Sequence, residues 1–235
     1  MTQIIVALDV PSAESALSLV DRLGDRVDFY KIGSPLFTRT GPSVVQALKD
    51  RGKRVFLDLK YHDIPSTVAN AVRSAAALDV DLLTVHASGG AAMLRAAVDA
   101  AGASGPRLLG VTILTSFSAD DVENVWDKKI LSVRDEVVRL ASHAAEAGLH
   151  GIVASPLEAE TLKRRHGADF LVVTPGIRPA GSGVADQTRT ATPADAARAG
   201  ADYLVIGRPI LEAADPAAVV DAVNEDVAAA SALTA

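Results

Sequence analysis

Short apolar segments rich in β-branched residues recur along the chain, and they alternate with longer segments whose apolar residues are spaced three or four apart. The short segments are typical of strands buried on both faces of a parallel sheet, and the longer ones of amphipathic helices. Residues 3–9 (QIIVALD) form the first segment of the strand type. Residues 11–24 follow with a helical stripe of apolar side chains, and Gly24 stands where a helix C-cap glycine is expected.

The same alternation continues along the rest of the chain. Seven more segments are predicted to be strands, at residues 27–33, 54–60, 81–87, 107–114, 150–155, 169–176 and 202–207. Amphipathic stretches between them are clearest at residues 44–52, 71–80, 136–148, 157–167 and 191–200.

Some helix boundaries carry their own signals. The clearest start lies in ATPADAARAG, where Thr192 can act as N-cap, Pro193 fits the first turn and Asp195 completes a capping-box pattern. We also expect a small helix at residues 118–127, in the longest gap, and a last helix that runs from about Pro209 into VVDAVNEDVAAASALTA.

Eight strand-plus-helix units within 235 residues predict a single-domain (β/α)8 barrel, a TIM barrel of the α/β class, over residues 1–235. A doubly wound open sheet is the alternative. It is disfavoured because eight units suffice to close a barrel and no G-x-G-x-x-G follows the first strand. Residues 177–191 form a long polar loop, which is either a tolerated insertion or a mobile loop over a site.

Composition narrows the class of protein. Hydrophobic residues make up 49% and charged residues 22%, as in globular proteins with a substantial core, and the net charge of -6 argues against nucleic-acid binding. The absence of cysteine excludes disulfides, thiolate metal sites and cysteine nucleophiles, and fits a reducing compartment. The start of the chain does not resemble a signal peptide, and no apolar run approaches the roughly 20 residues of a membrane span. We therefore expect a cytoplasmic protein without membrane contact.

In (β/α)8 barrels the reactive site lies at the C-terminal ends of the strands. Charged residues occupy several of those ends here: Asp9, Lys31, Asp58, Lys60 and, in the loop beyond, Asp63. Because strand residues two apart share a face, Asp58 and Lys60 are expected side by side. The expected array alternates in charge through Lys31, Asp58, Lys60 and Asp63.

This array has two interpretations. It could be a salt-bridge network that seals the barrel mouth, or it could perform chemistry at the end where barrels react. Carboxylates on both sides of Lys60 would favour its charged form. Lys60 would then act as a proton donor rather than as a nucleophile or a base.

A second set of strand-end residues suggests an anion site. Barrels often bind phosphate with the loops after the seventh and eighth strands, and here PGIRP follows the seventh and IGRPI the eighth. Arg178 and Arg208 would supply charge, while Gly207 would let the backbone approach the anion. Alternatively, the glycines and prolines only turn the chain and the arginines are solvated. Thr115 and Ser116 end the fifth strand nearby.

The signal for a metal is weak. His86 could be a ligand together with Asp58, but a lone strand-end histidine is more often a hydrogen-bonding neighbour. The sequence has no H-x-H or H-E-x-x-H pattern. We therefore expect no metal.

The segment FLDLKYHDIPST, residues 56–67, closely resembles the D-x-K-x-x-D-I-P-x-T signature of the orotidine 5′-monophosphate decarboxylase family. ALDV, DFYKIG, LTS, TPGIRP and IGRPI resemble flanking motifs of the same family, so the likeness covers nearly the whole chain. The resemblance implies a TIM barrel enzyme that makes uridine 5′-monophosphate without metal or organic cofactor. Lys60 would protonate C6 of the pyrimidine, Asp58 would face the substrate carboxylate, and Lys31 and Asp9 would hold the ribose hydroxyls.

The resemblance also implies further substrate contacts and a partner. Asp63 and Thr67 would enter the site from the other subunit of a homodimer, and Ile64 is expected to contact the substrate as well. Thr115 and Ser116 match positions near the nucleotide and its base. The residues that match the 5′-phosphate grip are Arg178, Gln187, Gly207 and Arg208, with Gln187 on a closing loop.

Three rival functions remain open from the residues. A sugar-phosphate decarboxylase or aldolase-like synthase of the same suprafamily would need a divalent metal and a glutamate in place of Lys31. A sugar-phosphate epimerase would need two histidines and two acids around a metal, and only His86 is well placed. A non-catalytic phosphate-binding barrel would have no need of Lys60 between two carboxylates.

Overall fold

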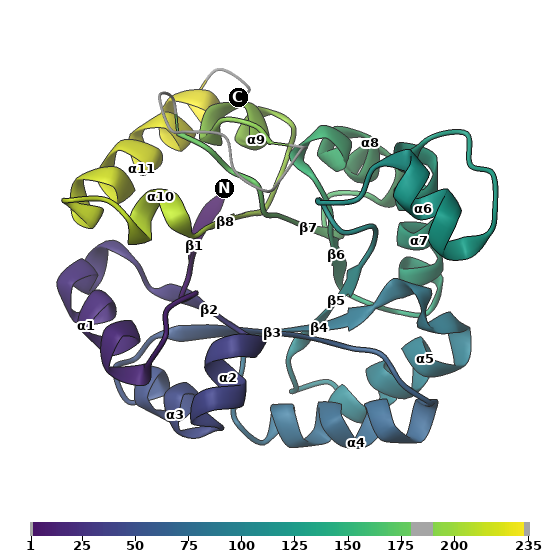
Figure 1. Cartoon of the computed structure of the whole chain (residues 1–235), viewed down its shortest axis with the longest axis horizontal. Helices are drawn as coiled ribbons and strands as arrows, with labels where there is room; N and C mark the ends of the chain where they lie inside the picture. Colours follow the sequence, from purple (N-terminus) through teal and green to yellow (C-terminus); the bar gives the residue numbers. More distant parts are fainter. Residues whose placement is uncertain (1, 180–189, 233–235) are drawn as a thin grey trace.

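The computed structural model describes residues 2–179 and 190–232, and its centre is a closed barrel of eight parallel strands in chain order (Figure 1). The strands are β1 (Gln3–Ala7), β2 (Phe29–Gly33), β3 (Arg54–Tyr61), β4 (Leu82–His86), β5 (Arg107–Val111), β6 (Gly151–Val153), β7 (Leu171–Thr174) and β8 (Tyr203–Ile206). The barrel closes where β8 pairs with β1, with Tyr203 opposite Gln3. The predicted TIM barrel is therefore confirmed, and the open-sheet alternative is wrong.

Helices form a ring around this barrel (Figure 1). They are α1 (Ala13–Leu23), α2 (Ser34–Thr40), α3 (Ser43–Lys49), α4 (Pro65–Ala76), α5 (Gly90–Ala101), α6 (Ala119–Trp126), α7 (Val133–Glu146), α8 (Pro156–His166), α9 (Pro193–Arg198), α10 (Arg208–Leu211) and α11 (Pro216–Ala232). Two short 3-10 helices are η1 (Gly24–Arg26) and η2 (Ala87–Gly89). Within the described parts of the chain, no helix combines the length and apolar character needed to span a bilayer.

The helix-start signals in the sequence have the expected structural basis at α9. The Thr192 hydroxyl accepts a hydrogen bond from the Asp195 backbone N–H, at 3.1 Å, and so satisfies one of the donors left over at a helix start. The predicted single last helix is wrong. It is divided into α10 and α11 because Asp215 Oδ1 accepts from the Ala217 and Ala218 N–H groups and starts a new helix.

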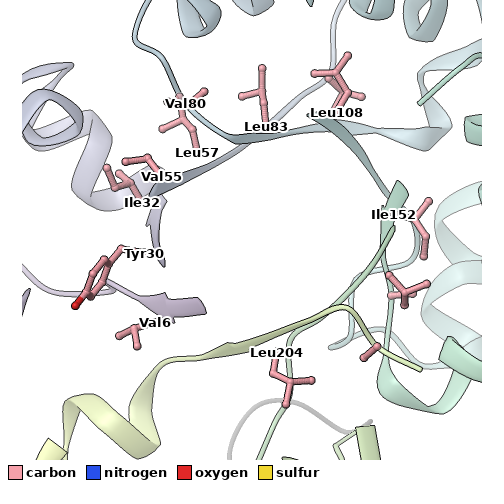
Figure 2. Close-up of a cluster of buried hydrophobic side chains, with 14 of the residues drawn as sticks. Val6, Tyr30, Ile32, Val55, Leu57, Val80, Leu83, Leu108, Ile152 and Leu204 are labelled. Carbon is pink, nitrogen blue, oxygen red and sulfur yellow. The ribbon is translucent and has the colours of Figure 1, made fainter. Parts of the chain in front are cut away.

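Strand alternation divides the apolar side chains into two layers. One set, which includes Ile5, Phe29 and Phe56, packs inside the barrel. The alternate set packs between the strands and the helices, and Figure 2 shows Leu83 and Leu108 of this set directed away from the barrel centre. Because side chains alternate along a strand, the inward set continues into polar residues at the C-terminal strand ends.

Candidate active site

A cavity of about 380 Å³ opens at the C-terminal ends of the strands. Its polar lining contains nine of the residues predicted from the sequence: Asp9, Lys31, Asp58, Lys60, Thr115, Ser116, Arg178, Gly207 and Arg208. Apolar side chains that the sequence analysis did not single out complete the wall, among them Val111, Ile113 and Val205. Each lies on a predicted strand, but an apolar side chain at a strand end does not by itself indicate a site.

Four of these residues form a chain of ion pairs, here called the charged array: Asp9, Lys31, Asp58 and Lys60. Lys31 Nζ lies 3.1 Å from Asp9 Oδ1 and 3.7 Å from Asp58 Oδ2. Lys60 Nζ lies 2.8 Å from both carboxylate oxygens of Asp58. The strand register brings them together, because β2 lies between β1 and β3 and places Lys31 beside Ala7 and Gly33 beside Asp58.

The centre of the charged array is removed from water. Lys31 is 8% exposed, and the side chain of Asp58 is 13% exposed. Burial by itself would raise the pKa of the Asp58 carboxyl. The ammonium groups of Lys31 and Lys60 and the hydrogen bonds from Lys60 and Thr84 outweigh burial, so the pKa of Asp58 lies below its ordinary value. Asp58 is therefore an ionised carboxylate near neutral pH.

Lys60 has an unusual backbone conformation. Its φ is 51°, in the left-handed region that costs a residue with a side chain about 1–3 kcal/mol. The pairing of β3 with β4 also changes register between Leu57 and Tyr61. Asp58 and Lys60 do reach the same cavity, as simple alternation predicted, but they do so through an irregular strand end.

Gly33 is a site residue that sequence reasoning missed. A Cβ atom at this position would lie 3.1 Å from Lys31 Nζ and 3.3 Å from Asp9 Oδ1. Any side chain there would crowd this ion pair. The available signal was a glycine two residues after a strand-end lysine, which indicates a close approach at the strand end.

Three predicted residues lie apart from the cavity of their own chain. Asp63, Ile64 and Thr67 are exposed and do not line it, and the Ile64 side chain is large, apolar and 63% exposed. Asp63 Oδ1 accepts a hydrogen bond from the Ile64 N–H at 2.6 Å. Within one chain, the charged array therefore ends at Lys60 and lacks the predicted member Asp63.

The ends of β7 and β8 carry the predicted anion-binding residues of the cavity, here called the arginine side: Arg178, Gly207 and Arg208. The Arg178 N–H donates to the Ala191 carbonyl at 2.9 Å, which ties together the two ends of the loop predicted at residues 177–191. Gln187 lies outside the described residues.

His86 lies next to the charged array but does not line the cavity. Its ring is 5.3 Å from the ring of His62. Burial, together with the nearby His62 and Lys60, lowers the pKa of His86, although Asp58 opposes this effect. Across residues 2–179 and 190–232, no group of three or more His, Cys, Asp or Glu side chains is arranged to hold a metal ion.

Comparison with known proteins shows the family of this chain. A family model described as "Orotidine 5'-phosphate decarboxylase / HUMPS family" matches residues 2–223. Orotidine 5'-phosphate decarboxylase of Nitrosospira multiformis is 49% identical over 225 residues, which cover 96% of this chain and 93% of the relative. The enzyme of the same name from Thermosynechococcus vestitus is 50% identical over 220 residues, or 94% of this chain and 93% of the relative.

A solved structure matches over a similar span. The crystal structure of orotidine 5'-phosphate decarboxylase from Lactobacillus acidophilus superimposes with a TM-score of 0.85 at 39% identity, and the match covers 97% of this chain and 99% of the other. The barrel, the family model and these relatives agree with the resemblance found in the sequence. The chain therefore belongs to the orotidine 5'-phosphate decarboxylase / HUMPS family.

Proposed function

We propose that this chain converts orotidine 5′-monophosphate to uridine 5′-monophosphate and carbon dioxide, the last step of de novo uridine 5′-monophosphate synthesis. The observation that carries the proposal is the charged array, in which an ionised, buried Asp58 holds the Lys60 ammonium at the cavity wall. Relatives named for this reaction match more than nine-tenths of the chain, which supports the same substrate.

The proposed chemistry breaks the bond between C6 of the pyrimidine and its carboxylate. Carbon dioxide leaves, and the electron pair of the broken bond stays on C6. The orotate ring delocalises this carbanion poorly, so a fixed positive charge beside C6 stabilises the transition state. Lys60 supplies that charge and then transfers one proton from Nζ to C6, and solvent restores the proton to Lys60 afterwards.

Asp58 has two roles in this proposal. Its two oxygens hold Lys60 Nζ in one position, so little reorganisation is needed when charge develops at C6. Its negative charge also faces the place of the substrate carboxylate, which disfavours the bound substrate relative to the transition state. Lys31 bridges Asp58 to Asp9, and we assign Lys31 and Asp9 to the ribose hydroxyls as well.

The arginine side binds the 5′-phosphate in this proposal. Arg178 and Arg208 line the same cavity as Lys60, and guanidinium groups match the oxygen geometry of phosphate. Gln187 completes the grip from the loop, and Thr115 and Ser116 contact the nucleotide near its base. The phosphate is remote from C6, so its binding energy orders the site without touching the reacting bond.

We propose further that the active form is a homodimer with shared sites. Asp63, Ile64 and Thr67 are exposed and lie outside their own cavity, which supports their use by a neighbour. In a two-fold dimer each chain gives the same residues that it receives. Asp63 of the partner would then extend the charged array beyond Lys60.

The direct test adds orotidine 5′-monophosphate to purified protein and follows the loss of orotate absorbance. The account expects turnover, with uridine 5′-monophosphate and carbon dioxide formed in equal amounts. Tight binding of both nucleotides with no turnover would instead favour a non-catalytic phosphate-binding barrel. A cytoplasmic location stays a prediction, and fractionation of expressing cells would test it.

A further inference from the structure

Thr84 is a buried residue of β4 that touches both ends of the Asp58–Lys60 pair. Its side chain is 0% exposed, and it lies on the inward-facing set of β4 between Leu82 and His86. The Thr84 hydroxyl donates to Asp58 Oδ1 at 3.0 Å. The same oxygen accepts a hydrogen bond from the backbone N–H of Lys60 at 2.9 Å.

The strand register explains why this hydroxyl is needed. Leu57 pairs with Leu83, and Tyr61 pairs with Val85. Residues 58–60 of β3 therefore lie opposite the single residue Thr84, and a regular ladder of carbonyls cannot serve that segment. A bulge of this kind leaves backbone groups without ladder partners. The Thr84 hydroxyl takes the place of a ladder carbonyl for Lys60.

The same contact bears on the strained backbone of Lys60. A residue with φ of 51° keeps that conformation only where its surroundings hold it. The hydrogen bond from the Lys60 N–H to Thr84 fixes the backbone, and the bond from Thr84 to Asp58 fixes the carboxylate that holds the Lys60 ammonium. One hydroxyl thus sets the backbone and, through Asp58, the side chain of the same lysine.

We propose that Thr84 is a positioning residue, whose hydroxyl holds Asp58 and Lys60 in their reacting geometry. Its kinetic consequence rests on the proposed decarboxylation, whereas its structural consequence does not. Other buried threonines show the contrast, because the hydroxyls of Thr112 and Thr174 donate to the backbone carbonyls of Val153 and Tyr203. These bonds join strands without touching the charged array.

The pKa of Asp58 gives a second way to test the role of Thr84. Asp58 is faced by Lys31 from β2, by Lys60 from β3, and by Thr84 and His86 from β4, with Asp9 and His62 one step further away. Loss of the Thr84 hydroxyl removes one of the bonds that hold the pKa of Asp58 down. The carboxylate would then be protonated at a higher pH, so the acid limb of the kcat/KM profile would move to higher pH.

The test compares Thr84→Val, which removes the hydroxyl at nearly constant shape, with Thr84→Ser, which keeps it. Thr174→Val is the matched control, since it removes an equally buried hydroxyl away from the array. Thr84→Val should lower kcat about 10- to 100-fold with little change in KM, because small displacements of reacting groups cost that much. Thr84→Ser should restore most of kcat and the position of the acid limb, and Thr174→Val should leave both unchanged.

A crystal structure of Thr84→Val separates this inference from the proposed function. We expect Lys60 to leave its left-handed conformation and its ammonium to move from Asp58. If that happens while the parent protein has no turnover, the function fails and the positioning role stands. A kcat within about twofold of the parent, or an unmoved Lys60, would overturn the inference. Should the valine variant not fold, Thr84→Cys keeps the size with a weaker hydrogen-bonding group, and the same outcomes decide.

Discussion

The two sides of the cavity differ in the side chains that carry their charge. On the side of β1, β2 and β3, the charged array consists of carboxylates and ammonium groups that contact one another at 2.8 to 3.7 Å. On the side of β7 and β8, Arg178 and Arg208 carry the charge. Among the described residues that line the cavity, the only carboxylates are Asp9 and Asp58, and both belong to the array.

Because of this difference, we expect the charged array and the arginine side to have different roles. The array is internally compensated and fixed before any ligand arrives, which suits charge stabilisation at a reacting atom. The guanidinium groups of the arginine side match the oxygen geometry of phosphate and suit an anion that remains unchanged in the reaction. Changes in the array should therefore affect kcat, and changes in the arginine side should affect how substrate binding energy is used.

The largest effect is expected from Lys60→Ala. This variant removes both the proton donor and the charge beside C6, so kcat should fall by at least about 10⁴-fold from the two contributions together. Binding of uridine 5′-monophosphate, measured by calorimetry, should survive because the arginine side is intact. Lys129→Ala is the control, because it also removes a lysine side chain, but one that is 93% exposed and does not line the cavity. If Lys60→Ala keeps more than about a hundredth of the parent activity, Lys60 is not the essential acid.

Removal of the substrate phosphate tests the role of the arginine side. Orotidine, which lacks the phosphate, should show kcat/KM lower by about a hundredfold or more, because remote binding energy is no longer available to order the site. Added phosphite or phosphate dianion should recover part of this loss in the parent protein, and Arg208→Ala should recover less. Comparable kcat/KM values for orotidine and its monophosphate would show that the arginine side has no catalytic use.

Mixing two damaged proteins tests whether the array extends into a partner. Lys60→Ala and Asp63→Ala proteins should each be nearly inactive. After subunit exchange, one site of each mixed dimer carries both lesions and the other carries neither. Half of the dimers are mixed at random equilibrium, so about a quarter of the parent activity should return. A tag on one chain verifies exchange. If activity stays at the level of the separate variants, Asp63 acts within its own subunit and the shared-site proposal is wrong.

The smallest effect is expected from metal removal. Lys31 is buried between Asp9 and Asp58 and places an ammonium group where metal-using relatives would need an acid. Dialysis against a strong chelator should leave kcat/KM unchanged, with or without added magnesium. A loss that magnesium restores would favour a sugar-phosphate reaction instead.

Much of this architecture could be predicted from the sequence, because buried parallel strands leave a simple signal. The continuous apolar runs at residues 3–9 and 54–60 have the length and β-branched content of strands. Alternation then places Asp9, Lys31 and Asp58 at one end of the barrel, and the structure brings all three together. The motifs of the family resemblance implied the same fold, and the closed barrel of the structure confirms it.

The details that set the geometry of Lys60 could not be predicted. A bulge opposite Thr84 depends on how β3 and β4 pair, and a lysine carries no signal for a left-handed backbone. In the sequence, Thr84 looks like one more residue of an apolar strand. Its hydrogen-bond partners, Asp58 and Lys60, belong to β3 and approach it only in the folded protein. The division of the last helix has a local cause, because Asp215 directly before Pro216 caps the start of a new helix.

The most direct test of the central claim follows the C6 hydrogen of the product. If Lys60 delivers the proton to C6, microscopic reversibility requires that it also remove that proton, so the enzyme should exchange it with solvent. Uridine 5′-monophosphate incubated with the protein in D2O should gain deuterium at C6, observed by NMR. Lys60→Ala should abolish this exchange while still binding the nucleotide. Equal rates of exchange in the parent and the variant would contradict the assignment of Lys60 as the proton donor.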